Sequence, residues 1–331
     1  MLAIFSAREV IQKAGEKMSL MQPSAPTVAA PLLSVISPFL YQQELTDLII
    51  GPAGTLWAET QQRPGLHRIS HLSFSEEECR ELAVNLAHAA GTRLDDAHPW
   101  ADGYLHWDEG IALRIHAVLP AIAPAGTTIS LRVLRPSQHT LADLVARKTL
   151  STAQCAQLVS HLDKHRSMLI TGATGTGKTT LLAALLATLP ETDRIVTIED
   201  TPELAISHPQ LVQLVTRTAN TENIGRLGMD VLLRQALRMR PDRLVVGEVR
   251  GKEIVDLLNA LNTGHRGALA SLHANSPRDV PQRILGLALA AGMPASAIRE
   301  QMRSGIDVVV HLWRDPATGL RTVAAIEDFQ C

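Results

Sequence analysis

The chain has 331 residues, of which 46% are hydrophobic, 19% are charged and 3% are aromatic, and its formal net charge is −2. This length is enough for two ordinary domains or one large one, and the composition is that of a soluble globular protein. The near-zero net charge gives no electrostatic argument for or against a nucleic-acid partner at the level of the whole chain, although a protein that works mainly by coating DNA is more often basic.

The cysteine spacing and the hydropathy of the chain indicate the cellular compartment in which we expect the protein. Cys79, Cys155 and Cys331 lie far apart and none belongs to a CxxC pair. This spacing argues against a disulfide framework and a thiolate zinc site, and it favours a reducing compartment. No apolar run approaches the roughly 20 residues that a membrane-spanning helix needs. We therefore expect a cytoplasmic protein that associates only peripherally with the inner face of the cytoplasmic membrane.

The first half of the chain predicts a small α+β domain over residues 31–136. Residues 1–30 have no sustained hydrophobic period, and we expect them to be poorly ordered. A helix is predicted over 75–90, with Ser75 as its cap. Short strands are predicted at 45–50, 55–59, 104–108, 111–117 and 128–134. Residues 137–150 hold a short helical stretch and are expected to be a linker.

Residues 151–331 alternate between apolar strands and helices, which predicts an α/β domain with a mostly parallel sheet. The expected strands are 168–171, 194–198, 211–216, 243–247, 268–272 and 307–312. The expected helices are 178–189, 229–240, 253–262 and 296–304.

The segment GATGTGKT satisfies the P-loop pattern G-x-x-x-x-G-K-[ST] at every fixed position. An apolar strand precedes it and a strong helix follows, so a chance match is disfavoured. Lys178 is placed to reach the β- and γ-phosphates of ATP, and the Thr179 hydroxyl to bind Mg²⁺. Nucleotide contacts are expected from Gly172, Ala173, Thr174, Gly175, Thr176, Gly177, Lys178, Thr179 and Thr180.

Two acidic strand ends compete for the role of activating the attacking water. Glu199, Asp200 and Glu203 follow the strand at 194–198, and Glu248 follows the strand at 243–247. Carboxyl ends of parallel strands gather at the ligand crevice. Glu248 resembles a Walker B acid and is a candidate magnesium ligand, and Gly247 before it predicts a close backbone approach. A solvated carboxylate is the alternative for either strand end.

His273 ends a further apolar strand, at 268–272. In that place it is a candidate for contacting the γ-phosphate of a bound nucleotide. A lone histidine is more often structural than functional, so spacing alone leaves both readings open.

These blocks, in this order, resemble the secretion-ATPase superfamily, the motors of type II and type IV secretion and of type IV and Flp pili. The blocks are GATGTGKT at Gly172, TIEDTPEL at Thr197, LRMRPDRLVVGEVRG at Leu237 and TGHRGALASLHANSPRD at Thr263. Their wording is most similar to the Tad/CpaF branch of Flp-pilus assembly ATPases. The resemblance extends over roughly residues 40 to 330 and implies a RecA/AAA-like P-loop domain.

The resemblance also implies roles for single residues. Glu199 and Glu203 match the family's Asp box, Glu248 its Walker B glutamate, and His265 with His273 its His box.

Arginines are the other group that the family match assigns. Arg114 and Arg132 match arginines of the family's N-terminal domain, and Arg217 matches one at a strand end. In the hexameric ring that the resemblance implies, the N-terminal domain closes over the nucleotide, and such arginines would reach it from that domain or from a neighbouring copy. The implied partners are other copies of the chain and polytopic inner-membrane platform proteins of a pilus or secretion machine.

Three functions remain open on the sequence. The favoured one is an ATP-driven motor for pilus assembly or secretion. A nucleic-acid translocase of a conjugation-type system is the alternative, and the scarcity of aromatic stacking platforms argues against it, so no specific nucleic-acid partner is expected. A nucleotide-binding regulator with weak hydrolysis is the third, and the two acidic strand ends argue for turnover.

Overall fold

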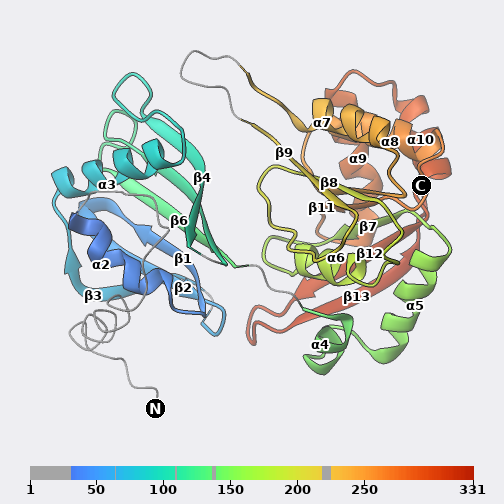
Figure 1. The fold of residues 1–331 in the computed structure, drawn as a ribbon, viewed down its shortest axis with the longest axis horizontal. Helices are drawn as coiled ribbons and strands as arrows, with labels where there is room; N and C mark the ends of the chain where they lie inside the picture. The colour runs from blue at the N-terminus through green and yellow to red at the C-terminus, as the bar shows by residue number, and fades with distance from the viewer. Residues whose placement is uncertain (1–30, 64, 109, 136–138, 218–224) are drawn as a thin grey trace. The chain divides into compact units, whose positions relative to one another are not determined.

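A computed structural model describes residues 31–63, 65–108, 110–135, 139–217 and 225–331 of the chain. The predicted disorder of residues 1–30 lies outside these ranges. The chain divides into two compact units, and the main chain passes from the first to the second after Arg135 (Figure 1).

The first unit is a six-stranded antiparallel sheet with helices on one face. The strand order is β3-β2-β1-β6-β5-β4. The elements are α2 (Pro31–Leu40), β1 (Leu45–Ile50), β2 (Thr55–Thr60), β3 (His67–Ser73), α3 (Glu76–Ala89), β4 (Trp100–Asp108), β5 (Ile111–Val118) and β6 (Thr128–Leu134).

Alternation along the strands decides which face the helices cover. On β6, Leu131 and Val133 point into a core that Leu82 and Leu86 of α3 complete, whereas Arg132 between them is exposed. The helix begins at a capping box in which Ser75 and Glu78 exchange hydrogen bonds with each other's backbone N–H groups. One face of this sheet is therefore apolar and covered, and the other is polar.

The second unit is a seven-stranded sheet of order β13-β12-β7-β11-β10-β8-β9. All neighbours run parallel except β12 and β13, which form an antiparallel pair. The strands are β7 (Met168–Thr171), β8 (Ile195–Glu199), β9 (Leu211–Val215), β10 (Arg243–Val249), β11 (Leu269–Leu272), β12 (Val308–Arg314) and β13 (Arg321–Asp328). The helices are α4 (Leu141–Ala146), α5 (Thr152–Asp163), α6 (Lys178–Leu186), α7 (Met229–Ala236), α8 (Glu253–Asn262), α9 (Val280–Ala290) and α10 (Ala295–Gly305).

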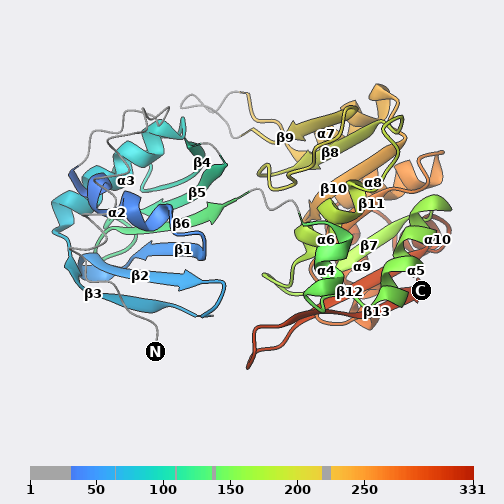
Figure 2. The ribbon, with the colours of Figure 1, turned by 60° about the horizontal axis from the view of Figure 1, so that its bottom comes forward.

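Helices cover both faces of this second sheet (Figure 2). Helices α4, α5 and α6 form one hydrophobic core with Met168 and Ile170 of β7. Helices α7 to α10 form a second core with Leu169, which lies between those two residues in β7 and points to the other face of the sheet. Such two-sided cover explains why the central strands are continuous apolar runs with no polar face. The α/β fold class predicted from the sequence is confirmed.

Several elements differ from the sequence expectation. Helices α2, α5 and α9 and strands β3 and β13 were not expected, and the strand expected at 104–108 extends back to Trp100. Residues 137–150, expected to be a linker, include α4, which packs against α6 within the second unit.

Candidate functional site

The segment 172–179, here called the 172–179 loop, joins β7 to α6 at the carboxyl edge of the second sheet. Its glycines Gly172, Gly175 and Gly177 have φ angles of 144°, 76° and 97°. These left-handed values favour glycine. A Cβ on Gly172 would also lie 2.4 Å from the carbonyl oxygen of Leu312. The loop conformation therefore depends on glycine at these positions.

Lys178 opens helix α6 and folds back over the loop. Its Nζ donates to the carbonyl oxygens of Gly172 and Ala173, at 3.0 and 2.9 Å. Burial lowers the pKa of Lys178, and the nearby Glu248 carboxylate partly offsets that effect. The ammonium is thus held inside the loop by carbonyl groups that an anion can replace.

The other residues predicted to contact nucleotide line the same loop. Thr179 and Thr180 lie half-buried in the first turn of α6, whereas Thr174 is exposed. Thr176 is buried, and its Oγ1 donates to the carbonyl oxygen of Ala173 at 2.9 Å.

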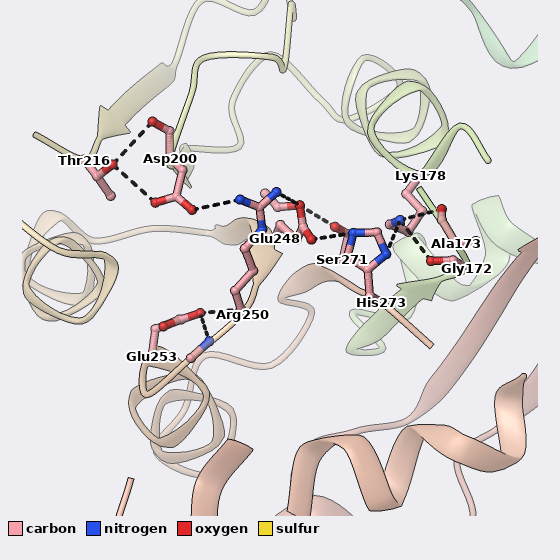
Figure 3. Close-up of polar contacts among 12 residues, drawn as sticks. Gly172, Ala173, Lys178, Asp200, Thr216, Glu248, Arg250, Glu253, Ser271 and His273 are labelled. Atoms are coloured by element: carbon pink, nitrogen blue, oxygen red, sulfur yellow. Dashed lines mark hydrogen bonds and ion pairs between the residues drawn. The ribbon is translucent and has the colours of Figure 1, made fainter. Parts of the chain in front are cut away.

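Polar contacts lead from the loop to the neighbouring strands (Figure 3). Lys178 Nζ lies 3.4 Å from Nδ1 of His273, which follows β11, and His273 Nε2 lies 2.7 Å from Oε1 of Glu248 on β10. The contacts follow strand order, because β11 lies between β7 and β10 in the sheet. Parallel strands end at the same edge, as the sequence argument required.

The ring of His273 links the two charged groups. Lys178 can only donate, so Nδ1 of a neutral ring accepts in the contact with Lys178, and the Gly172 backbone also hydrogen-bonds to the ring. Burial and the Lys178 charge lower the pKa of His273, which favours this neutral form. The Glu248 contact is close but departs from ideal hydrogen-bond geometry.

A β-bulge in β10 aims Glu248 at the site. Val246 pairs with Ala270 and Val249 with Leu272, so three steps along β10 face two along β11. Ser271 Oγ donates to the Gly247 carbonyl oxygen at 2.5 Å within the bulge. Bulges of this kind re-aim side chains next to active sites.

Arg250 extends the contact set toward β8 and was not predicted as a site residue. Its guanidinium donates to Glu248 Oε2 at 2.5 Å and lies 3.7 Å from Oδ2 of Asp200. The other carboxylate oxygen of Asp200, Oδ1, accepts from the Thr216 hydroxyl. Burial tends to raise the pKa of Glu248, but the hydrogen bond and charge of Arg250 lower it overall. Its position two residues after Glu248, just beyond the end of β10, was the available signal.

Glu199, the first acid of the predicted Asp box, is 3% exposed. Its Oε1 accepts from the backbone N–H groups of Glu203 and Leu204, at 3.0 and 2.9 Å, and so shapes the loop that carries Glu203. Burial raises the pKa of Glu199 to about 7. A Cβ on Gly247 would lie 2.9 Å from Glu199 Cγ, which is the close approach that the sequence predicted at this glycine.

Glu203 and Arg217 lie on the exposed surface of the second unit. Arg217 follows β9, and its Nε donates to the carbonyl oxygen of Gly225 at 2.8 Å. His265 stands before β11, at the opposite end of that strand from His273. The structure of this unit therefore does not bring His265 to the site.

Arg114 and Arg132 belong to the first unit. They are direct neighbours across β5 and β6, on the polar face of that sheet. Arg132 Nε donates to Asp47 Oδ1 at 3.0 Å. The expectation that they reach a nucleotide stays a prediction.

The oxygen donors present fit a magnesium ion that arrives with a nucleotide. Thr179 offers a hydroxyl and Glu248 an ionised carboxylate, and Mg²⁺ in such sites takes its other ligands from phosphates and water. In the described part of the chain no group of three or more histidine, cysteine, aspartate or glutamate side chains could hold a metal by itself. The same residues include no helix long and apolar enough to cross a membrane.

Comparison with known families decides where the chain belongs. Residues 33–323 match the family described as type II/IV secretion system protein. The chain belongs to this family. The resemblance seen in the sequence blocks is confirmed at that level, and the match includes both units.

Relatives within the family carry several names. A Mycobacterium tuberculosis protein (strain H37Rv) named for conjugal transfer is 46% identical over 295 residues, 88% of this chain and 83% of that protein. The type IV secretion system protein VirB11 of Brucella suis is 28% identical over 310 residues, 85% of this chain and 84% of that protein.

Solved structures of the family share the fold. The Legionella pneumophila ATPase DotB matches with a TM-score of 0.64 at 19% identity, over 93% of this chain and 84% of that one. The pilus retraction motor PilT with bound ADP matches with a TM-score of 0.64 at 20% identity, over 91% and 83%. Identities this low establish the fold alone.

Proposed function

We propose that the chain is a Mg²⁺-dependent P-loop ATPase that drives a secretion or pilus-assembly machine. The observation that carries the proposal is the contact from Lys178, through His273, to Glu248. The ammonium of Lys178, which is suited to binding phosphate, and the carboxylate of Glu248 lie at one sheet edge with His273 between them, and this supports a nucleotide site there. Membership in the type II/IV secretion system family supports the secretion part of this function, and the complete P-loop pattern at 172–179 supports ATP as the nucleotide.

In this proposal the resting contacts rearrange when ATP binds. The phosphates enter the 172–179 loop, and Lys178 exchanges the carbonyl oxygens of Gly172 and Ala173 for phosphate oxygens. Thr179 and Glu248 would hold Mg²⁺, which would supply positive charge to the phosphates. Glu248 then orients water for attack on the γ-phosphorus, and neutral His273 keeps Glu248 in register with the loop.

Hydrolysis assays on two variants test the proposal. Lys178→Ala is expected to lose both nucleotide affinity and hydrolysis, because Lys178 contacts the phosphates in the ground state and in the transition state. Glu248→Gln is expected to bind ATP and hydrolyse it at least roughly 100-fold more slowly, because Glu248 acts on the attacking water. Phosphate release by purified, folded protein, with and without Mg²⁺, is the measurement. Hydrolysis by Lys178→Ala at the wild-type rate would overturn the proposal.

For the biological process we propose assembly of a Tad/Flp-type pilus or a related secretion process, by a homohexamer docked on polytopic inner-membrane platform proteins. The similarity of the Walker B and His-box sequences to the Tad/CpaF branch supports this process. Glu199, Glu203, Arg114, Arg132 and Arg217 enter the proposal as supporting residues of the composite catalytic site.

Conjugation is the second candidate, because a relative at 46% identity is named for conjugal transfer. The same phosphate-release assay, repeated with single-stranded DNA, separates the two. A protein-assembly motor is expected to turn over at the same rate with and without DNA. Stimulation that falls steeply with salt would favour a translocase.

A further inference from the structure

The two neighbours of β7 give the 172–179 loop two different sides. On one side β11 and β10 carry His273 and Glu248. On the other side β12 pairs with β7 and turns back into β13, so that Arg314 stands directly opposite Arg321. These two arginines, here called the hairpin arginines, lie outside the contact set of Figure 3.

The hairpin arginines touch the loop itself. Arg321 Nε donates to the carbonyl oxygen of Gly175 at 3.0 Å. A Cβ on Gly175 would lie 3.4 Å from Nη1 of Arg314, and one on Gly177 would lie 3.5 Å from Cδ of Arg321. Glycine at these positions therefore leaves room for the guanidinium groups as well as for the loop conformation.

Positive charge accumulates here without an acidic partner. Among the described residues neither hairpin arginine forms a salt bridge. Burial lowers the pKa of Arg321, and the charges of Arg314 and Arg147 lower it further. The adjacent Asp315 instead accepts from the N–H groups of Ala317 and Thr318 and closes the hairpin turn. Like charges directly opposite each other destabilise a strand pair, so an anion bound between them and the loop would relieve the repulsion.

We propose that the hairpin arginines strengthen nucleotide binding. Arg314 pairs with the α- and β-phosphates, and Arg321 positions the 172–179 loop through its hydrogen bond to the Gly175 carbonyl oxygen. This inference rests on the proposed function. Glu248 marks the side of the γ-phosphate, so the phosphates that ATP and ADP share lie nearer the hairpin. The hairpin arginines thus set affinity for both nucleotides and take no part in bond cleavage.

Binding and turnover of hairpin variants test this assignment. Arg314→Ala and Arg321→Gln are expected to weaken binding of ATP and ADP alike by about 10-fold or more, as expected for loss of a charge-assisted contact. Their kcat at saturating ATP should stay within about 2-fold of wild type, since uniform binding is what is lost. Arg321→Lys, which keeps the charge but loses the forked donor, should fall between Arg321→Gln and wild type.

Inorganic triphosphate provides a probe without base or ribose. It should compete with ATP for the wild-type protein and compete about 10-fold less well for Arg314→Ala. Arg299→Ala, on the exposed surface of α10, is the matched control and should bind like wild type. Melting temperatures identify any variant that fails to fold. If Arg321→Gln fails to fold, the nucleotide affinity of Arg314→Ala alone decides the test.

Two results would overturn the assignment while leaving the proposed function intact. One is wild-type affinity in both hairpin variants alongside lost affinity in Lys178→Ala. The other is unchanged affinity with a lowered kcat, which would place the arginines in the chemical step. A wild-type protein that binds no nucleotide would instead refute the proposed function itself.

Discussion

At the scale of single residues, Glu199 and Glu248 show how burial separates two carboxylates at one sheet edge. Glu248 is kept ionised by Arg250, whereas Glu199 is buried under its own loop with one oxygen, Oε2, left without a hydrogen-bond partner. An unpaired buried carboxylate is costly when charged. The two carboxyl groups therefore differ in how readily they ionise, which suits Glu248 for interaction with water or metal and Glu199 for holding the loop.

The buried Glu199 makes stability depend on pH. Its pKa is raised from 4.5 to about 7, so between these values the unfolded chain ionises while the folded chain does not, and the folded state loses stability as the pH rises. Glu199→Gln cannot titrate and keeps an acceptor for the Glu203 and Leu204 N–H groups. We expect its free energy of unfolding to exceed that of wild type by up to about 3 kcal/mol at pH 8, with the gain absent at pH 4.5.

Urea unfolding at the two pH values measures this difference. Glu300→Gln, exposed on α10, is the control and should show no pH-dependent gain. A gain of equal size at both pH values would mean that Glu199 is ionised to the same extent in both states.

At the scale of elements, the bulge of β10 and the glycine within it fix the distance between β10 and β8. Gly247→Ala would set a Cβ 2.9 Å from Glu199 Cγ and 3.4 Å from the carbonyl oxygen of Ile198. Overpacking of this kind costs about 1–3 kcal/mol. We expect a lower free energy of unfolding and slower ATP hydrolysis, because a shift of β10 moves Glu248.

A helical glycine provides the contrast for this variant. Gly286→Ala lies on the exposed face of α9, where an added Cβ meets nothing within 4 Å. It is expected to stabilise the protein by roughly 0.5–1 kcal/mol, as alanine does in a helix. Equal stability of Gly247→Ala and wild type would show that β8 and β10 separate without cost.

Elements with strong apolar patterns were predictable, and those with mixed patterns were not. The buried strands β7, β8, β10 and β11 are continuous apolar runs, which are typical of a sheet covered by helices on both faces. The 172–179 loop follows β7, and Glu199 and Glu248 lie at the ends of β8 and β10. In contrast, β3 and β13 lie at sheet edges and mix polar with apolar residues without the strict alternation that indicates a strand, and α2 carries Pro38 inside it.

Partners distant in the sequence limited prediction of the site. Glu248 and Lys178 were identified because each belongs to a local motif. Arg321 meets Gly175 across 146 positions of the chain, and only the pairing of β12 with β7 and β13 brings them together. The engagement of Arg250 with Asp200 likewise depends on β8 lying beside β10.

At the scale of the whole molecule, the proposed ATP hydrolysis raises the question of which arginine acts at the γ-phosphate. Phosphoryl transfer gains from an arginine beside the γ-phosphate. In the described part of the second unit, Arg250 is engaged with two acids and the hairpin arginines lie on the other side of the loop. Arg217, the other candidate in this unit, donates to the carbonyl oxygen of Gly225. We therefore propose that Arg114, Arg132 or both supply that charge from a neighbouring copy in a hexamer.

Mixing two inactive variants tests supply of an arginine between copies. Lys178→Ala retains Arg114 and Arg132, while the double variant Arg114→Ala/Arg132→Ala retains the 172–179 loop, so a ring that contains both has interfaces with every catalytic group present. We expect each alone to hydrolyse ATP at least about 10-fold more slowly than wild type and the mixture to regain part of the activity, since one arginine finger is worth far more than that. Light scattering with a non-hydrolysable ATP analogue should show six copies. A monomer under every nucleotide condition, or a mixture no more active than its parts, would mean that each copy completes its own site.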